Sequence, residues 1–391
     1  MPAINAERLL ATFLELVQID SPTGKEAAVA AYCKRALEEA GCKVRIDDSQ
    51  EVTGSNTGNL IATLAASEGP FCGPSEALFF SAHMDSVNPC LGIKPLITNG
   101  VIHTDGTTVL GGDDKVGIAA ILELIRCLAE GASAGEPHPE IRVLFTVAEE
   151  TGLLGAKALN KAEFLNSQGA FCYVLDAAGL PGLVVNGAPY QYSYRAEYRG
   201  LASHAGIAPE AGISAIRAAA QAIAALPQGR IGEESTTNVG LISGGTANNV
   251  VAGECVVTGE LRSHCADQIK ILRSEITEIL TTAGKDDGTG AGLAEVCVQW
   301  ELDYEGFFAP DDSPEVQLAL RAAEELSLPA LTEKSNGGAD TNVLVSYGLA
   351  AVSLGSGMER VHSAAECLAV SSLENLARLV LRIVRISQTE V

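Results

Sequence analysis

The apolar run Leu78–Phe80 leads into two residues that can bind a metal ion, His83 and Asp85. A short apolar run bounded by turn residues predicts a buried strand. Side chains two positions apart in a strand point to the same side, so His83 and Asp85 leave the strand end together. Because open α/β sheets bind ligands beyond the carboxyl ends of their strands, this strand end is a candidate functional site.

Two later strands have the same character and also end in acidic residues. Ile141–Val147 is followed by Glu149 and Glu150, and Phe171–Leu175 ends at Asp176. Helical segments separate these strands. Strands that alternate with helices predict an α/β fold with a mixed, largely parallel sheet sandwiched by helices.

The N-terminal part of the chain shows helix signals and one long loop. Asn5 is expected to cap a first helix, and Thr23 and Glu26 have the spacing of a capping box at the start of a second. Residues 86–110 have little periodicity and many turn residues, which indicates a loop that includes a hairpin.

The pattern changes after about Val185, which indicates a second domain. The expected order is strand, helix, strand, strand, helix, strand, over residues 190–199, 214–226, 236–241, 250–262, 267–282 and 294–302. This βαββαβ order is the ferredoxin-like arrangement. From Tyr304 the α/β character returns, so residues 188–303 are expected to be inserted into a domain made of 1–187 and 304–391.

Charge and composition exclude some classes of partner. The formal net charge of −23 argues against nucleic acid and anionic membranes, because both bind basic patches. Met1–Arg8 lacks the basic and apolar regions of a signal peptide, and no stretch of ~18 apolar residues occurs. The ten cysteines are scattered without a C-x-x-C pair. We therefore expect reduced thiols and a cytoplasmic protein.

Five segments carry side chains of the kind that bind metal ions. They are His83, Asp113 with Asp114, Glu149 with Glu150, Asp176, and His362. Strand ends converge, so these acids at one sheet edge would repel one another unless they shared a cation. Two Zn²⁺ ions fit, because three carboxylates and one hydroxide balance four positive charges and the histidines add neutral ligands. Mn²⁺ or Co²⁺ also suits a ligand set without thiolate.

Such a site predicts hydrolysis of a carbonyl compound. One carboxylate would bridge the two metals, and a bridging water with a lowered pKa would be the nucleophile. In the Glu149 and Glu150 pair, one residue can bind metal while the other accepts the proton of the water.

These motifs identify a family. The chain resembles the co-catalytic zinc exopeptidases and deacylases, which include peptidase T, glutamate carboxypeptidases, aminoacylases and succinyl-diaminopimelate desuccinylase. The resemblance covers essentially the whole chain and rests on Ser81-Ala82-His83-Met84-Asp85, Gly111-Gly112-Asp113-Asp114-Lys115, Ala148-Glu149-Glu150-Thr151-Gly152, Asp176 and Val361-His362-Ser363. The Asp-Asp-Lys motif, the length and the segment Gly244–Val251 look most like peptidase T, a tripeptide aminopeptidase.

The resemblance implies a role for each residue of the metal centre. His83 and Asp176 would hold the first zinc, and Glu150 and His362 the second. Asp113 would bridge them, with a cis peptide bond after it. Glu149 would be the general base that activates the bridging water, and Asp85 would orient His83.

The resemblance also implies roles for the inserted domain, which would act as a lid and a dimerisation domain. His204 would assist the oxyanion, in many family members from the lid of a partner subunit, so a homodimer is expected. Asn248 and Arg262 would contact substrate, and the guanidinium of Arg262 would grip the free carboxylate of a short peptide.

Two departures from peptidase T leave the substrate open. The segment Asn336–Asn342 differs from that family, and Val147-Ala148 replaces Pro-Asp before the Glu-Glu pair. The leading prediction is an exopeptidase that removes the N-terminal residue of short peptides. An N-acyl-amino-acid deacylase or a carboxypeptidase with the same metal chemistry is the alternative. A non-catalytic metal-binding protein is a third reading, against which the unligated carboxylate of Glu149 argues.

Overall fold

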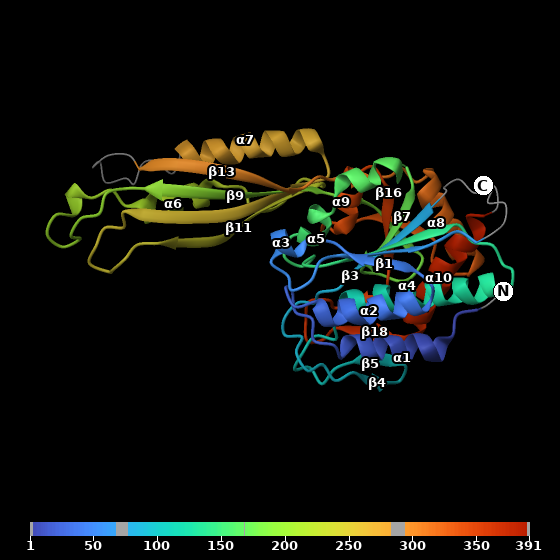
Figure 1. Ribbon diagram of the computed structural model, residues 1–391. Coiled ribbons are helices and arrows are strands. Elements are labelled where there is room, and N and C mark those ends of the chain that lie inside the picture. Colours follow the sequence, from blue (N-terminus) through green and yellow to red (C-terminus); the bar gives the residue numbers. More distant parts are fainter. Residues whose placement is uncertain (1–2, 68–76, 168, 283–293, 389–391) are drawn as a thin grey trace. The chain divides into compact units, whose positions relative to one another are not determined.

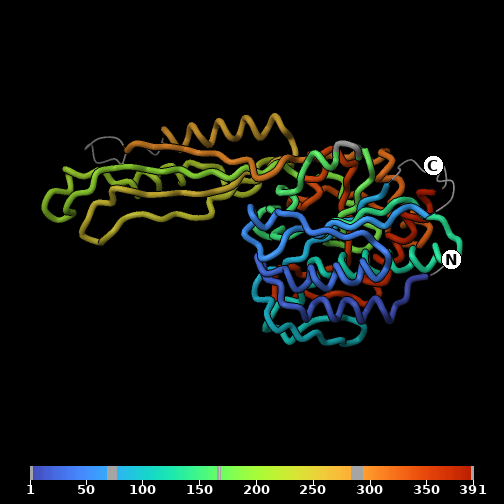
Figure 2. The backbone as a smooth tube through the Cα atoms, in the orientation of Figure 1, coloured from blue at the N-terminus to red at the C-terminus, as the bar shows by residue number. Residues whose placement is uncertain are grey.

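The structure is a computed structural model that describes residues 3–67, 77–167, 169–282 and 294–388. The chain forms two compact units. Unit 1 comprises Met1–Gly187, Phe308–Ser335 and Ala339–Val391, and unit 2 comprises Ala188–Phe307 and Asn336–Gly338. Figure 2 follows the chain through unit 1 in blue to green, through unit 2 in green to orange, and back to unit 1 in orange and red.

Unit 1 is built on one large sheet (Figure 1). Its strand order is β1-β2-β6-β3-β7-β16-β8-β14, with β15 beside β8. The strands are β1 (Lys43–Ile46), β2 (Leu60–Leu64), β3 (Ala77–His83), β6 (Glu140–Thr146), β7 (Phe171–Ala177), β8 (Leu183–Ala188), β14 (Phe307–Phe308), β15 (Leu331–Lys334) and β16 (Ala350–Gly355). The central strands β6, β3, β7 and β16 run parallel, whereas β1 and β2 are antiparallel to their neighbours. The predicted mixed, largely parallel sheet is therefore confirmed.

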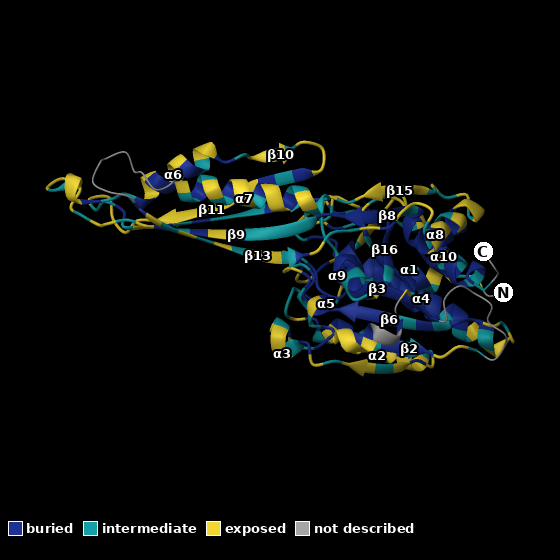
Figure 3. Cartoon of the chain, turned by 90° about the horizontal axis from the view of Figure 1, so that it is seen from above, coloured by how far each residue is buried: buried dark blue, intermediate teal, exposed yellow. Residues whose placement is uncertain are grey.

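Both faces of this sheet are buried, which explains the apolar strands. On β3, Leu78 and Phe80 belong to the larger core on one face, and Phe79 belongs to a smaller core on the other. Figure 3 shows β3, β6 and β16 as buried. Strands that must be apolar on both sides lack the alternation of a half-exposed strand.

Helices pack on both sides of the sheet. The helices of unit 1 are α1 (Ala6–Val17), α2 (Ala27–Glu39), α3 (Gln50–Thr53), α4 (Gly112–Ser133), α5 (Leu154–Ala158), η1 (Lys161–Ser167), α8 (Pro314–Glu325), α9 (Asp340–Ser346) and α10 (Val370–Ile386). The larger core contains residues of α1, α2, α4, α8 and α10, and the smaller core lies under η1 and α9. Asn5 caps α1 as predicted, because its side chain accepts a hydrogen bond from the N–H of Arg8.

A second, small sheet combines a hairpin from the predicted long loop with two short strands from the C-terminal part of the chain. Its order is β17-β18-β5-β4, formed by β4 (Leu96–Thr98), β5 (Val101–His103), β17 (Met358–Glu359) and β18 (Cys367–Ala369). β4 and β5 are the expected hairpin. The capping box at α2 was a wrong prediction, since the hydroxyl of Thr23 donates to Asp85 and the N-cap residue Glu26 makes no side-chain capping bond.

Unit 2 is a separate antiparallel sheet with two main helices. Its elements are β9 (Tyr190–Arg199), η2 (Pro209–Ala211), α6 (Ala215–Ala225), β10 (Gly229–Ile231), β11 (Ser235–Gly244), β12 (Glu254–Ser263), α7 (Ala266–Thr282) and β13 (Glu295–Tyr304). The sheet order is β10-β11-β12-β9-β13. Without the short β10, the long strands stand in the order second, third, first, fourth, which is the ferredoxin-like arrangement.

The strand predicted over residues 250–262 begins later than expected. β12 starts at Glu254, because Val250 forms an isolated bridge with His204 and the N–H of Val251 donates to the carbonyl of Ser203. Those bonds join two loops instead of extending the ladder.

Among the described residues, none of the helices is both long enough and apolar enough to cross a membrane. Nine of the ten cysteines are described, and each is a free thiol.

Candidate metal centre

The parallel strands of unit 1 bring the predicted ligands together. His83 is the last residue of β3, and its register partner on β6 is Thr146, three residues before Glu149. Asp176 lies near the end of β7, on the other side of β3. Because parallel strands end at the same sheet edge, the residues that follow them meet there.

Asp113 lies between the two histidines. Its Oδ1 is 2.9 Å from Nε2 of His83, and its Oδ2 is 3.2 Å from Nε2 of His362. Nε2 of His362 is also 3.1 Å from Oε1 of Glu150. Nε2 of His83 is 3.8 Å from Oδ1 of Asp176. One carboxylate thus faces two imidazoles, and each imidazole has a further acid beside it.

Two groups of possible metal ligands result from this packing. Ligand atoms of His83, Glu149 and Asp176 lie within 4.8 Å of one another, and so do those of His83, Asp113 and Glu150. Glu149 and Glu150 therefore both lie within reach of the cluster. The peptide bond between Asp113 and Asp114 is cis, as the resemblance implied.

The electrostatics of the cluster favour a bound cation. Burial raises the pKa of Asp176 well above its ordinary value, and the nearby charge of Asp113 adds to the raise. Burial also raises the pKa of Glu149 well above its ordinary value, with Asp340 and Glu150 adding to it against the opposite effect of His83. Oε1 of Glu150 is buried and makes no hydrogen bond of good geometry, although His362 is near. Buried acids of this kind fit a divalent cation with nitrogen and oxygen ligands.

The two histidines hold protons strongly beside these acids. Contacts with Asp113 and Glu150 raise the pKa of His362 to about 10. Burial raises the pKa of Asp113, but contacts with His362 and His83 outweigh burial, so that its pKa is lowered. A metal ion would replace these protons as the positive partner of the carboxylates.

Asp85 touches both His83 and the segment that carries the glutamates. Its Oδ1 is 3.4 Å from Nδ1 of His83 and accepts the N–H of Glu149 at 3.1 Å. Its Oδ2 accepts the N–H of Glu150 at 3.2 Å and the hydroxyl of Thr23 at 2.8 Å. Asp85 can therefore orient the imidazole and hold the backbone at both glutamates.

The backbone before Glu149 is held in the same way by two residues that the sequence did not indicate as part of the site. Oδ1 of Asn59 accepts the N–H of Val147, and Oε1 of Glu26 accepts the N–H of Ala148. Four successive N–H groups, from Val147 to Glu150, thus donate hydrogen bonds to the side chains of Asn59, Glu26 and Asp85. Ala148 adopts a φ of +51°, which is uncommon for a residue with a side chain.

Another buried acid, Glu366, contacts the segment around Asp113. It accepts the N–H groups of Gly111 and Asp113. The sequence signal for Glu366 was weak, since an acid four residues after His362 has no motif of its own.

The residues predicted in unit 2 lie in two places. His204 and Asn248 are exposed and belong to neighbouring loops, joined by the bridge between His204 and Val250 and by the bond from the N–H of Ala205 to the carbonyl of Asn249. These loops lie at the end of the sheet where Arg199 pairs with Glu254.

Arg262 lies at the other end of β12, where it pairs with Gln191. Its guanidinium binds both carboxylate oxygens of Glu260, at 3.2 and 3.0 Å, and donates to the carbonyl of Asn336. Eight residues separate Arg262 from Glu254 along the strand, which corresponds to about 27 Å. One copy of unit 2 therefore does not bring Arg262 together with His204.

Comparisons with known proteins indicate the family of the chain. Residues 59–203 match the model of peptidase family M28, and residues 191–288 match the peptidase dimerisation domain. The uncharacterised protein YqjE of Bacillus subtilis is 39% identical over 381 residues, covering 97% of this chain and 98% of that protein. Peptidase T of Fusobacterium nucleatum is 27% identical over 301 residues, covering 75% of this chain and 69% of that protein.

Two solved structures are similar over nearly the whole chain. The aminopeptidase PepT from Bacillus cereus is 39% identical, with a TM-score of 0.87 and coverage of 98% of this chain and 99% of that chain. A tripeptidase from Staphylococcus aureus is 37% identical, with a TM-score of 0.89 and coverage of 99% and 100%. From these matches, the chain is a peptidase that belongs to the dizinc exopeptidase family, close to peptidase T.

Proposed function

We propose that this protein is a dizinc aminopeptidase that hydrolyses the N-terminal peptide bond of short peptides, with tripeptides as the main substrates. The observation that carries the proposal is the position of Asp113, whose two carboxylate oxygens face His83 and His362. The aminopeptidase and tripeptidase descriptions of the similar structures support the substrate class.

The contacts around Asp113 support one assignment of the metal ligands. His83 and Asp176 would bind one ion, His362 and Glu150 the other, and Asp113 both. Zn²⁺ is the expected metal, with Co²⁺ or Mn²⁺ as substitutes for the same ligands. When bound, such ions supply Lewis-acid activation of a water and of the scissile carbonyl.

Glu149 would act as the general base. Its carboxylate is about nine-tenths buried beside the ligand cluster, and burial raises its pKa. A carboxylate of raised pKa is better suited to accept a proton near neutral pH and to pass it to the leaving amine. Asp85 supports this role by accepting the N–H of Glu149, which fixes the backbone at the general base.

Unit 2 would act as a lid and form a homodimer. His204 would donate to the developing oxyanion, Asn248 would add a polar contact, and Arg262 would bind the free carboxylate of the substrate. Because His204 and Arg262 lie at opposite ends of one sheet, we place His204 in the site of the partner subunit. A cytoplasmic location fits the free thiols of the described cysteines.

Metal removal and a substrate panel test this function. Purified protein is treated with a chelator, assayed on tripeptides, N-acetylated amino acids and C-terminally extended peptides, and reassayed after addition of Zn²⁺, Co²⁺ or Mn²⁺. We expect loss of activity on chelation, recovery with metal, and release of the N-terminal residue from tripeptides. Full activity in metal-free protein would refute the metal mechanism, and hydrolysis of only the acylated amino acids would refute the aminopeptidase assignment.

A further inference from the structure

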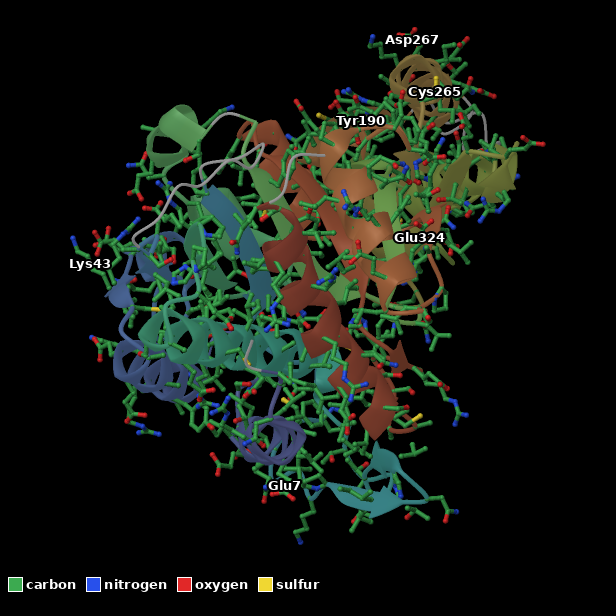
Figure 4. All side chains as sticks on the ribbon, turned by 90° about the vertical axis from the view of Figure 1, so that its right-hand side faces the viewer. Glu7, Lys43, Tyr190, Cys265, Asp267 and Glu324 are labelled. Carbon is green, nitrogen blue, oxygen red and sulfur yellow. The ribbon has the colours of Figure 1, made fainter. Side chains whose placement is uncertain are left out.

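Glu366 is an acidic residue in an unusual environment for its type. Acidic side chains normally lie on the surface, as Glu7 and Glu324 do (Figure 4). Glu366 is 2% exposed and lies in the segment between β17 and β18. A buried carboxylate is costly unless its oxygens are bound, so its partners indicate why it is there.

Both oxygens of Glu366 bind the backbone around Asp113. Oε2 accepts the N–H of Gly111 at 2.9 Å, and Oε1 accepts the N–H of Asp113 at 3.0 Å. The carbonyl of Asp113 accepts the hydroxyl of Ser86, which in turn accepts a hydrogen bond from Lys115. The main chain of Asp113 is therefore fixed on its N–H side by Glu366 and on its C=O side by Ser86.

The position of Glu366 also links two segments that are distant in sequence. It follows His362 by four residues, and its own N–H donates to the carbonyl of Ser363. His362 and Arg360 both have positive φ values, +60° and +56°. A residue with a side chain keeps such a conformation only where its surroundings hold it. Glu366 thus connects the loop of His362 to the segment of Asp113.

We infer that Glu366 is a positioning residue that sets the metal affinity of the site by holding Asp113 and the His362 loop in the geometry that two metal ions require. This inference rests on the metal site of the proposed function. Glu366 would not touch a metal ion or the substrate. Partners that orient ligands typically change metal affinity by about 10–100-fold when they are mutated.

The glycine at position 112 agrees with close packing around the carboxylate of Glu366. A Cβ added to Gly112 would lie 3.0 Å from Oε1 of Glu366. Glycine at this position therefore leaves room for the carboxylate between the N–H groups of Gly111 and Asp113. Gly112→Ala would force the carboxylate to shift by a few tenths of an ångström while leaving every charge of the site in place.

The test compares Glu366→Gln with Glu123→Gln. Glu123 is a matched control, since it is fully buried on α4 and accepts the N–H of Asn5 and the guanidinium of Arg8, outside the metal centre. Zn²⁺ alone is the probe, and its dissociation constants are measured by competition with a chromophoric chelator. Thermal unfolding of the metal-free proteins is measured in parallel.

We expect Glu366→Gln to weaken Zn²⁺ binding about 10–100-fold and Glu123→Gln to leave it unchanged. Because the ligands themselves remain, kcat of Glu366→Gln should return toward the parent value at saturating metal. If Glu366→Gln does not fold, Gly112→Ala provides the same measurement and should weaken binding in the same direction.

Zn²⁺ binding by Glu366→Gln and Gly112→Ala at the parent affinity would overturn the inference while leaving the proposed function intact. An equal loss of affinity in Glu123→Gln would also overturn it, because general destabilisation would then explain the effect. If the parent protein bound no metal, the proposed function itself would fail.

Discussion

The metal ligands predicted in unit 1 and the substrate contacts predicted in unit 2 are both implied by the resemblance to one family, yet the fold distributes these residues differently. In unit 1, side chains from five separate segments meet around Asp113. In unit 2, Asn248 and His204 lie at one end of the sheet and Arg262 at the other.

The direction of the strands explains this difference. β6, β3 and β7 run parallel, so their carboxyl ends all reach one edge and successive motifs add to one site. The strands of unit 2 are antiparallel, so the residues after β9 and before β12 lie at one edge and the end of β12 lies at the other. A parallel sheet therefore concentrates strand-end residues, whereas an antiparallel sheet divides them between two edges.

The largest expected effect comes from removing the residue shared by both halves of the metal centre. Asp113→Ala should lower kcat/KM by roughly 10⁴-fold or more, because both ions would lose a ligand and their Lewis-acid contribution is worth several kcal/mol. Metal content by mass spectrometry should fall below one ion per chain. Retention of two ions and of the parent activity would show that Asp113 is not required for metal binding or for catalysis.

Glu149→Gln should lower kcat by about 10²–10⁴-fold while the metal content stays at the parent value, since a general base has effects of this size. Glu150→Gln is the matched variant, and it should lose metal. Each glutamate belongs to one of the two groups of possible ligands, so this pair of variants decides between their roles. Loss of metal from Glu149→Gln with retention in Glu150→Gln would exchange the assignments.

His204→Ala should lower kcat by about 10²–10³-fold on all peptides, the usual cost of one oxyanion donor. Mixing it with Glu149→Gln tests where His204 acts. If His204 serves the partner's site, each mixed dimer has one intact site, and an equal mixture should regain about a quarter of the parent activity. A mixture as inactive as its components would place His204 in the site of its own subunit.

The smallest effect is expected for Arg262→Lys, which keeps the charge but not the planar fork. We expect about a 10–100-fold loss of kcat/KM on free-acid tripeptides, the size of a charged hydrogen bond, and little loss on C-terminal amides. Glu260→Gln is the control, because Glu260 binds this guanidinium in the structure. Equal losses on acids and amides, reproduced by Glu260→Gln, would make Arg262 a structural partner of Glu260.

The sequence was sufficient to predict the central strands β3, β6 and β7 of unit 1 and the residues that follow them, whereas β8, β14 and β15 were not predicted. The uninterrupted apolar run Leu78–Phe80 indicates burial on both faces of the sheet. Because the ends of parallel strands converge, the grouping of His83 with Asp176 followed from general rules. The succession of strand and helix patterns predicted the βαββαβ order of unit 2.

What the sequence did not reveal are contacts between loops. Glu26 was interpreted as part of a local capping box, whereas its partner at Ala148 is 122 residues away. Glu366 binds residues 253 and 255 positions before it. No local periodicity encodes such pairs, because each depends on how two irregular segments pack. The late start of β12 has the same cause, since the bonds of Val250 and Val251 are made with the loop around Ser203.

The four N–H groups from Val147 to Glu150 have a consequence for how the active site assembles. Each donates a hydrogen bond to the side chain of Asn59, Glu26 or Asp85, and all three acceptor residues are buried. A segment bound in this way exchanges its amide protons only when the surrounding core opens. This segment therefore loses its backbone entropy during folding, before any metal ion binds. Metal binding would therefore add charge to a framework that is already rigid, with little rearrangement of the chain at Glu149 and Glu150.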